Sequence, residues 1–406
     1  MTERILFLPH RIPYPPDKGD KVRSYHILRH LAEHADVYLG SFVDDPDDRV
    51  HVERVRGWCR EACIVPLAPA RARLRALSGL ARGLPLTVPY YADRRLRAWV
   101  QRTLARRRID RVLAFSSSMA QYAEPAGGIR REIDFVDIDS DKWAQYARHR
   151  RGPMAWLYRR EARTLARYEC RIALAFDASY LVSEDEAAAF RDQCPGAAGR
   201  IHALENGVDT AYFRPGAAPA SPYAAGERAL VFTGAMDYWP NVDAVTWFAD
   251  SVLPAVQARE PAARFYVVGR RPTDAVRALD ARSGVTVTGG VPDVRPYLEH
   301  AVVAVAPVRV ARGVQNKVLE AMAMARPVVC SPSAFEGIRA SAGRELLVGA
   351  SAADQARLVG ECLAGGHREV GRAARACVER HYGWSARLAD LVATEPGAAR
   401  VAEGAG

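Results

Sequence analysis

The chain has 406 residues, of which 49% are hydrophobic and 26% charged, and its formal net charge is +10. This composition is typical of a globular protein with room for two domains. No stretch approaches the roughly 20 uninterrupted apolar residues of a membrane span, and the start resembles a first strand more than a signal peptide.

The seven cysteines are scattered along the chain and lack a CxxC pair. Cys59 and Cys63 lie four residues apart, a spacing that suits one face of a helix better than a zinc knuckle. We therefore expect unpaired structural cysteines, and a cytoplasmic protein.

Short apolar stretches alternate with helical stretches through the first half. The expected strands are ILFLP, VYLGSF, ACIVPL, RVLAFS, REIDFVDID and ASYLVS. A stretch rich in Pro, Gly and Ala follows from Cys194 to Gly226, and it is typical of a linker. The alternation then restarts with ALVFTGAM, RFYVVG, VTVTGG, VVAVAPV and RPVVCS.

Two successive halves of this kind predict an α/β fold with two Rossmann-like domains facing a cleft. We place the first domain at residues 1–198 and the second at residues 199–377. A C-terminal helix near 378–395 and a mobile tail at 396–406 complete the chain. Because ligands of parallel sheets bind beyond the carboxyl ends of the strands, the loops there are the places to search.

Basic residues gather in two stretches. Twelve arginines and two acids lie between Arg71 and Arg111, and a second cluster runs from Arg148 to Arg171. With Trp143, Trp156 and Tyr158, they would suit an anionic membrane surface and a lipid-linked acceptor. An ordinary solvated face explains them equally well. Nucleic-acid binding is not predicted, because charge alone supports it and no known module is present.

The most informative segment runs from Pro307 to Ile338. After the strand VVAVAPV, Gly313 allows backbone amides to approach a ligand. A helix that begins near Gln315 or Asn316 would present its N-terminus to the same place. A helix N-terminus attracts anions through its free amides and its dipole.

Charged side chains accompany this helix start. Arg309, Arg312 and Lys317 supply positive charge, and Glu320 lies about one turn into the helix. A carboxylate at that position can accept hydrogen bonds from two ribose hydroxyls. A diphosphate beside a ribose is typical of a nucleotide sugar. The alternative is a capped core helix with solvated charges.

Within this segment, VLEAMAMARPVV resembles the donor-binding signature of the retaining glycosyltransferases of family 4, which have the GT-B architecture. Four more segments resemble that family in order: ENGVDTAYFRP between the domains, FTGAMDYWPN and VTGGVPDVRPYL in the donor domain, and HYGWSARLADLVA in a C-terminal helix that crosses back to the first domain. The resemblance extends over nearly the whole chain. It implies a hexosyltransferase that uses a nucleotide sugar, with a UDP-sugar favoured over a GDP-sugar, and retains configuration.

The resemblance and the residue pattern together give the candidate donor-binding residues. They are Gly234, Gly290, Arg309, Gly313, Val314, Gln315, Asn316, Lys317 and Glu320. Two departures matter. Arg312 replaces the acid that the family has eight residues before Glu320, and Ala235 and Asn241 stand where the family often has Arg and Lys. We therefore treat Arg312 as a catalytic candidate that helps to neutralise the diphosphate.

The N-terminal segment PHRIPYPPDKGDKVRSYHILRHLA and the later segment DIDSDKWAQYA resemble sugar transferases of exopolysaccharide and PEP-CTERM/exosortase gene clusters. This likeness implies a role in a bacterial surface glycan. The N-terminal loop supplies the candidate acceptor-binding residues Lys18, Gly19, Asp20, Lys21 and Arg23. An exposed polar loop is the alternative.

Aspartates follow the strand REIDFV. Asp137 and Asp139 share one face of it, and Asp141 follows in the loop. In related enzymes this strand end lies near the acceptor hydroxyl, so Asp139 and Asp141 are catalytic candidates. An aspartate cluster also suits a metal, but the donor site has its own cations, and we expect no metal and no cofactor.

The resemblance implies a mechanism in which the leaving diphosphate takes the acceptor's proton while the hydroxyl attacks from the same face. A nucleotide-sugar epimerase is an alternative enzyme. A non-catalytic protein that only binds glycan or a partner is another, given the missing acid. A nicotinamide dehydrogenase is disfavoured, because no GxGxxG follows the first strand.

Overall fold

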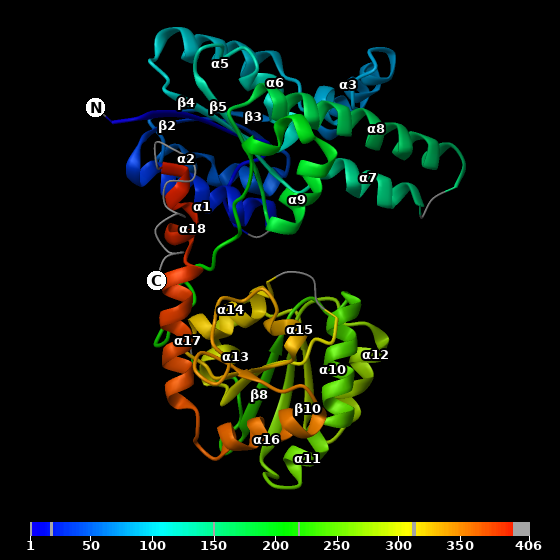
Figure 1. Ribbon diagram of the computed structural model, residues 1–406, viewed down its shortest axis with the longest axis vertical. Coiled ribbons are helices and arrows are strands. Elements are labelled where there is room, and N and C mark those ends of the chain that lie inside the picture. Colours follow the sequence, from blue (N-terminus) through cyan, green and yellow to red (C-terminus); the bar gives the residue numbers. More distant parts are fainter. Residues whose placement is uncertain (1, 17–18, 149–150, 218–219, 311–313, 393–406) are drawn as a thin grey trace. The chain divides into compact units, whose positions relative to one another are not determined.

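The computed structural model describes residues 2–16, 19–148, 151–217, 220–310 and 314–392. They form two compact units. The first comprises the chain up to Asn206 together with the end of the last helix from Leu388, and the second is Gly207–Arg387. Figure 1 shows a sheet in each unit, with helices on both of its faces.

The first unit contains a parallel sheet with the strand order β3-β2-β1-β4-β5-β6-β7 in its described residues. Its interior strand β1 is apolar, and Ile5 to Leu8 are fully buried. Neighbouring β1 and β4 pair in register, with Ile5 opposite Arg111. The strands are β1 (Arg4–Pro9), β2 (Asp36–Val43), β3 (Glu61–Pro66), β4 (Arg111–Phe115), β5 (Arg130–Val136), β6 (Ala178–Leu181) and β7 (Ile201–Ala203).

Helices connect these strands along the chain. They are α1 (Gly19–His34), α2 (Val52–Arg56), α3 (Pro69–Ala81), α4 (Thr87–Tyr90), α5 (Arg94–Arg106), α6 (Ala120–Ala123), α7 (Asp139–Arg148), α8 (Gly152–Ala175) and α9 (Glu184–Gln193). Short 3-10 turns lie at Pro46–His51, Ser117–Met119 and Pro195–Arg200.

The second unit repeats the plan with the strand order β10-β9-β8-β11-β12-β13, again parallel in the described residues. The strands are β8 (Arg228–Thr233), β9 (Ala263–Val268), β10 (Val285–Gly289), β11 (Val303–Ala306), β12 (Val328–Cys330) and β13 (Leu347–Val348). The helices are α10 (Trp239–Ser251), α11 (Leu253–Gln257), α12 (Asp274–Arg277), α13 (Arg295–His300), α14 (Asn316–Ala323), α15 (Pro332–Phe335), α16 (Ala352–Leu363), α17 (Arg368–His381) and α18 (Trp384–Val392), with a 3-10 turn at Ala278–Ala281.

The predicted α/β fold with two parallel sheets is confirmed. The borders differ in detail from the prediction. The first unit continues past residue 198 because β7 pairs with β6, with Ile201 opposite Ser179. The predicted helix near 378–395 consists of the end of α17 and of α18, since α17 ends at His381.

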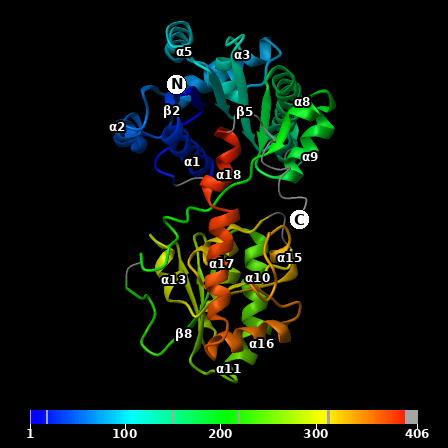
Figure 2. The same cartoon turned by 60° about the vertical axis from the view of Figure 1, so that its left-hand side comes forward.

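Helix α17 belongs to the second unit, whereas α18 begins in that unit and ends in the first. Helix α17 packs against α14 of the second unit, and Figure 2 shows it running along that unit. The end of α18 lies in the first unit, where Leu388 and Leu391 are buried and Arg111 donates a hydrogen bond to the Leu391 carbonyl. The predicted tail at 396–406 lies outside the described residues.

The expectation that all cysteines are unpaired is wrong. Cys170 on α8 and Cys194 after α9 form a disulfide, with their Cα atoms 5.4 Å apart. Their 24-residue separation has no recognisable spacing, so only the packing of the two segments reveals the pair. Cys59, Cys63, Cys330, Cys362 and Cys377 are free.

Candidate functional site

A cavity of about 460 Å³ lies in the second unit, where β8, β9 and β10 end and α14 begins. Carboxyl ends of parallel strands meet at one edge, so residues distant in sequence converge there. The lining residues are Thr233, Gly234, Ala235, Asn241, Val268, Gly269, Arg270, Gly290, Val291, Val294, Val314, Gln315, Asn316, Lys317 and Glu320.

Seven of the nine candidate donor-binding residues line this cavity. They are Gly234, Gly290, Val314, Gln315, Asn316, Lys317 and Glu320. Gly313 and the catalytic candidate Arg312 lie outside the described residues. The remaining residue, Arg309, is absent from the described lining.

Backbone forms the floor of the cavity. A Cβ on Gly269 would lie 1.6 Å from the Gly234 carbonyl oxygen, and a Cβ on Gly234 would lie 2.8 Å from Asn241 Nδ2. A side chain at residue 269 would therefore clash with backbone, and one at residue 234 would displace the Asn241 amide. The close approach of β8 and β9 leaves main-chain groups next to the cavity, where a ligand can reach them.

The N-terminus of α14 opens on the same cavity. Its cap residue Gln315 has extended backbone geometry and makes no side-chain cap hydrogen bond. The first amides of a helix have no partner within the helix, and they carry the positive end of its dipole. An anion in the cavity would meet these amides.

Lys317 and Glu320 provide opposite charges on the first turn of α14. Lys317 Nζ donates to Gln315 Oε1 at 3.2 Å and lies 5.5 Å from the centre of the Phe232 ring. Burial lowers the pKa of Lys317 to about 8, although the Glu320 charge raises it. Burial raises the pKa of Glu320 to about 7, although Lys317 lowers it. Both groups can therefore gain or lose a proton near neutral pH.

Arg270 and Asn241 also line the cavity, and neither was predicted as a ligand. Arg270 is exposed and follows β9. Asn241 is 4% exposed, and its Nδ2 donates to the Ala235 carbonyl at 2.9 Å. Its Oδ1 is buried and has no hydrogen-bond partner among the described residues. The comparison of Asn241 with the family's lysine pointed to the position, but no local pattern pointed to Arg270.

Arg309 is held away from this lining by an ion pair. Its Nε donates to Asp243 Oδ2 at 2.9 Å, and its guanidinium lies 5.8 Å from the centre of the Trp247 ring. The hydrogen bond to Asp243 raises the pKa of Arg309. Its charge is therefore already neutralised by an acid from α10.

The acceptor candidates Lys21 and Arg23 lie in the interior of the first unit, not on an exposed loop. Both are 0% exposed. Lys21 Nζ donates to Asp48 at 3.0 and 3.1 Å. Arg23 Nε donates to Asp134 Oδ2 at 2.8 Å, and its NH1 donates to Asn206 at 2.9 Å. A ligand cannot reach side chains that are buried in this way.

The Arg23–Asp134 pair instead supports the end of β5. Asp134 Oδ1 accepts from the amide of Val136, whose φ is +71°. A β-branched residue is strained in this left-handed region. The pair therefore supports a backbone turn that leads directly into α7.

Asp20 remains partly exposed on α1, while Gly19 begins that helix and Lys18 lies outside the described residues. His10 Nε2 and Arg11 NH1 each lie 3.2 Å from Asp20 Oδ2. Burial raises the pKa of Asp20, but the hydrogen bond and charge of His10 and the charge of Arg11 outweigh it and lower the pKa to about 2. Asp20 is thus an ionised carboxylate at neutral pH.

The aspartate candidates lie where β5 leads into α7. Lys142 Nζ is 2.7 Å from Asp137 and 3.4 Å from Asp139. Burial raises the pKa of Asp139, although Lys142 lowers it. Asp141 is exposed. Asp139 and Asp141 thus lie together on the first turn of α7, with a lysine balancing part of the charge.

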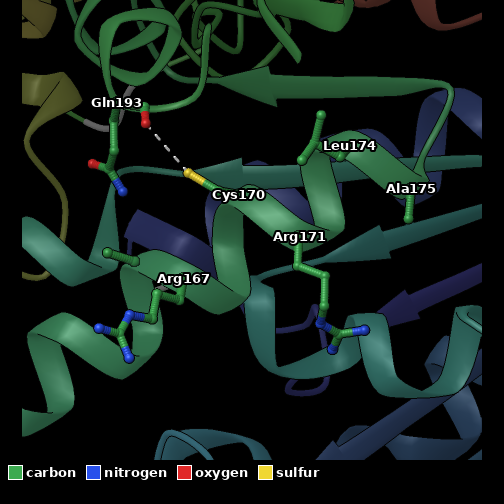
Figure 3. A pocket seen from close by; sticks show the side chains of 7 residues that line it. Arg167, Cys170, Arg171, Leu174, Ala175 and Gln193 are labelled. Carbon is green, nitrogen blue, oxygen red and sulfur yellow. Dashed lines mark hydrogen bonds between the residues drawn. The ribbon is translucent and has the colours of Figure 1, made fainter. Parts of the chain in front are cut away.

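A larger hollow of about 590 Å³ lies in the first unit along α8. Figure 3 shows Arg167, Cys170, Arg171, Leu174 and Gln193 around it. Its described lining contains neither an acid nor a free thiol, because Cys170 is in the disulfide. The chemistry therefore favours the cavity at α14 as the functional site.

Residues 227–364 match the family model described as "Glycosyl transferases group 1", and this range contains all the described residues that line the α14 cavity. The chain carries a glycosyltransferase domain. No curated protein sequence matches the chain.

Solved structures show that the GT-B fold extends beyond this glycosyltransferase domain. Alr3699/HepE from Anabaena, in complex with UDP, aligns with a TM-score of 0.60 and 14% identity over 96% of this chain and 98% of that chain. Sucrose-phosphate synthase from Thermosynechococcus elongatus aligns with a TM-score of 0.61 and 17% identity over 96% of this chain and 97% of that chain. WaaG, a glycosyltransferase involved in lipopolysaccharide biosynthesis, aligns with a TM-score of 0.56 and 15% identity over 96% of this chain and 100% of that chain.

Proposed function

We propose that the chain transfers a sugar from a UDP-sugar to a glycan or lipid-linked acceptor, with retention of configuration. One observation carries the proposal: a helix N-terminus, a lysine and a carboxylate face one glycine-floored cavity inside the glycosyltransferase domain. The structure of Alr3699/HepE in complex with UDP supports the choice of nucleotide. A GDP-sugar is the alternative donor.

In this proposal the diphosphate binds to the amides at the start of α14. Lys317 and Arg270 neutralise its charge, and Glu320 accepts hydrogen bonds from the ribose hydroxyls. Gly290, directly after β10, lies beside the base. Arg312 and Gly313 complete the diphosphate site.

The acceptor hydroxyl forms a bond to the anomeric carbon as the bond from that carbon to the diphosphate breaks. The diphosphate oxygen takes the proton of the hydroxyl, which attacks from the same face. Asp139 and Asp141 orient the hydroxyl. Protein groups contribute mainly positioning and stabilisation of the leaving charge.

We further propose that the chain is a cytoplasmic enzyme of bacterial exopolysaccharide synthesis and that it needs no metal. The resemblance to PEP-CTERM-associated transferases supports the pathway. The cations at the cavity support metal independence, because they can replace a divalent ion at the diphosphate. An acceptor on a lipid would bring the enzyme to the membrane surface.

A thermal-shift panel tests this function. The purified chain is heated with UDP, GDP and ADP in EDTA, and then with magnesium. We expect UDP to raise the melting temperature in EDTA, because a ligand that binds only the folded state stabilises it. The absence of a shift with any nucleotide at millimolar concentration would contradict the proposal and favour a non-catalytic protein.

A further inference from the structure

Helix α3 exposes its largest apolar side chains and buries its smallest residues. Ala72, Ala76 and Gly79 face the protein, whereas Leu74 and Leu77 are 70% and 55% exposed. A surface helix of a globular protein normally does the reverse, because burying leucine stabilises the fold more than burying alanine. The two leucines lie three residues apart and are therefore neighbours on one helix face.

The adjoining ends of α7 and α8 contribute further exposed apolar side chains. Tyr146 is 56% exposed, Met154 46% and Trp156 55%. The Tyr146 ring lies 6.0 Å from the Trp143 ring, which lies 5.2 Å from Tyr158. The aromatic cluster therefore runs from the partly buried rings of Tyr158 and Trp143 to the exposed ring of Tyr146.

Hydrogen bonds from one arginine join α8 to the end of α3 and to the segment that follows it. Arg160 on α8 donates to the carbonyl of Gly79 at 2.9 Å and to that of Leu84 at 3.2 Å. Figures 1 and 2 show α3 and α8 in the same part of the first unit. A cavity of about 290 Å³ lies between α3, α4, α7 and α8, lined by Ala76, Leu86, Thr87, Tyr90, Trp143, Leu157, Tyr158 and Glu161.

We name the α3–α8 surface after these helices and define it by Leu74, Leu77, Tyr146, Met154 and Trp156. Its apolar side chains come from elements that meet at one cavity. Exposed apolar groups gathered in this way are typical of an interaction site.

The exposed charge along the two stretches that carry the α3–α8 surface is positive, although Glu161 lines the cavity and exposed Asp141 precedes the second stretch. Residues 69–82 and 142–160 contain no acid. Exposed cations in the described part of these two stretches are Arg71, Arg73, Arg82, Lys142, Arg148, Arg151 and Arg159, of which Lys142 is paired with Asp137 and Asp139. A second copy would bring like charges together, whereas anionic lipid headgroups would complement them.

We propose that the α3–α8 surface docks on an anionic phospholipid bilayer. The leucines, Met154 and Trp156 enter the boundary between headgroups and acyl chains, and the arginines contact lipid phosphates. No helix in the described part of the chain is long and apolar enough to cross a membrane, so the contact is peripheral. The docking proposal rests on the proposed function in one respect only: that function gives the reason for docking, which is access to a lipid-linked acceptor.

Co-sedimentation with vesicles tests the docking without donor or acceptor. The full chain is mixed with vesicles of phosphatidylcholine alone or with added phosphatidylglycerol. We expect binding to the anionic vesicles, which weakens as salt rises. The double variant Leu74→Ser/Leu77→Ser should bind at least about tenfold more weakly, because two partly buried leucines are lost from the contact.

Leu174→Ser is the matched control. Leu174 is 53% exposed on the other end of α8, outside the α3–α8 surface. It should bind vesicles like the wild type, and both variants should keep the wild-type UDP thermal shift. That shift separates failure of docking from failure of the donor site.

Two results would overturn the proposal. One is a wild-type chain that does not bind anionic vesicles. This result includes the case in which the wild type forms a dimer that the double variant cannot form. The other is equal vesicle binding by the double variant and by Leu174→Ser. In that case charge alone, and not the α3–α8 surface, would account for binding.

Discussion

Two loop-to-helix segments, one in each unit, place cations after a parallel strand, yet the structure uses these cations differently. In the first unit, Lys21 and Arg23 are completely buried and bound to Asp48 and Asp134. In the second unit, Lys317 lines a cavity. The difference lies in the acids: each N-terminal cation has a carboxylate in direct contact, whereas Lys317 Nζ donates to the amide oxygen of Gln315.

A cation beyond a strand end therefore has two uses. Paired with a buried acid, it fixes the backbone around a site. Where a cavity lies beside the cation, the cation can instead bind a negatively charged ligand. Substituting the two types of cation should therefore separate stability from nucleotide binding.

The largest expected effect is on stability, in Arg23→Met. This substitution leaves Asp134 as a buried charge without its ion-pair partner, which should lower the free energy of unfolding by about 3–5 kcal/mol. Urea unfolding, followed by circular dichroism, measures this loss. A variant that unfolds at the wild-type urea concentration would show that the pair does not support the first unit.

The second effect is on UDP binding, in Lys317→Met. Losing a charged hydrogen bond to the diphosphate should cost about 1.5–3 kcal/mol, or roughly 10- to 100-fold in affinity. Unfolding should change by less than about 1 kcal/mol, because no acid in direct contact loses its partner. Calorimetric titration with UDP measures the affinity. Strong destabilisation with unchanged affinity would place Lys317 in the same class as Arg23.

The third effect is a dependence of UDP affinity on pH. Lys317 has a pKa of about 8, so its positive charge is lost as the pH rises through 8 and affinity for the diphosphate should fall. Glu320 has a pKa of about 7, so its acceptor form is lost as the pH falls through 7. Affinity should therefore be highest between about pH 7 and 8.

Lys317→Arg provides the control for this profile, because arginine stays charged throughout the range. The alkaline loss should disappear in this variant while the acidic loss remains. If the loss of UDP affinity at alkaline pH persists in this variant, another group must cause it, and Lys317 is not the cation that contacts the phosphates.

The smallest effect is expected in Arg270→Ala. Arg270 is exposed, so water screens its attraction to the diphosphate, and the loss should be at most about fivefold, or 1 kcal/mol. The adjacent Arg271→Ala is the control, because Arg271 is 71% exposed and paired with Asp237 at 3.3 Å. Equal losses in the two variants would indicate a general charge effect instead of a contact at the cavity.

The sequence predicted the α14 cavity better than the N-terminal loop for a physical reason. Gln315, Lys317 and Glu320 are neighbours on one helix start, so their spacing alone places them together. The partners of Lys21 and Arg23 lie 27 and 111 residues away. No local pattern shows that such cations are already paired.

Other features that depend on tertiary packing were also missed. The disulfide between Cys170 and Cys194 forms where α8 meets the segment after α9. Arg270 reaches the cavity only because β9 lies beside β8 in the sheet. The alternation of apolar strands and helices, by contrast, is a local property. It predicted both parallel sheets, but not the short edge strands β7 and β13.

A crystal structure of the chain with UDP, grown in EDTA, would show whether the α14 cavity binds the nucleotide. We predict diphosphate oxygens at the first amides of α14 and at Lys317, with the ribose hydroxyls at Glu320. UDP bound away from the α14 cavity, or bound there with Lys317 and Glu320 both out of contact, would contradict the account.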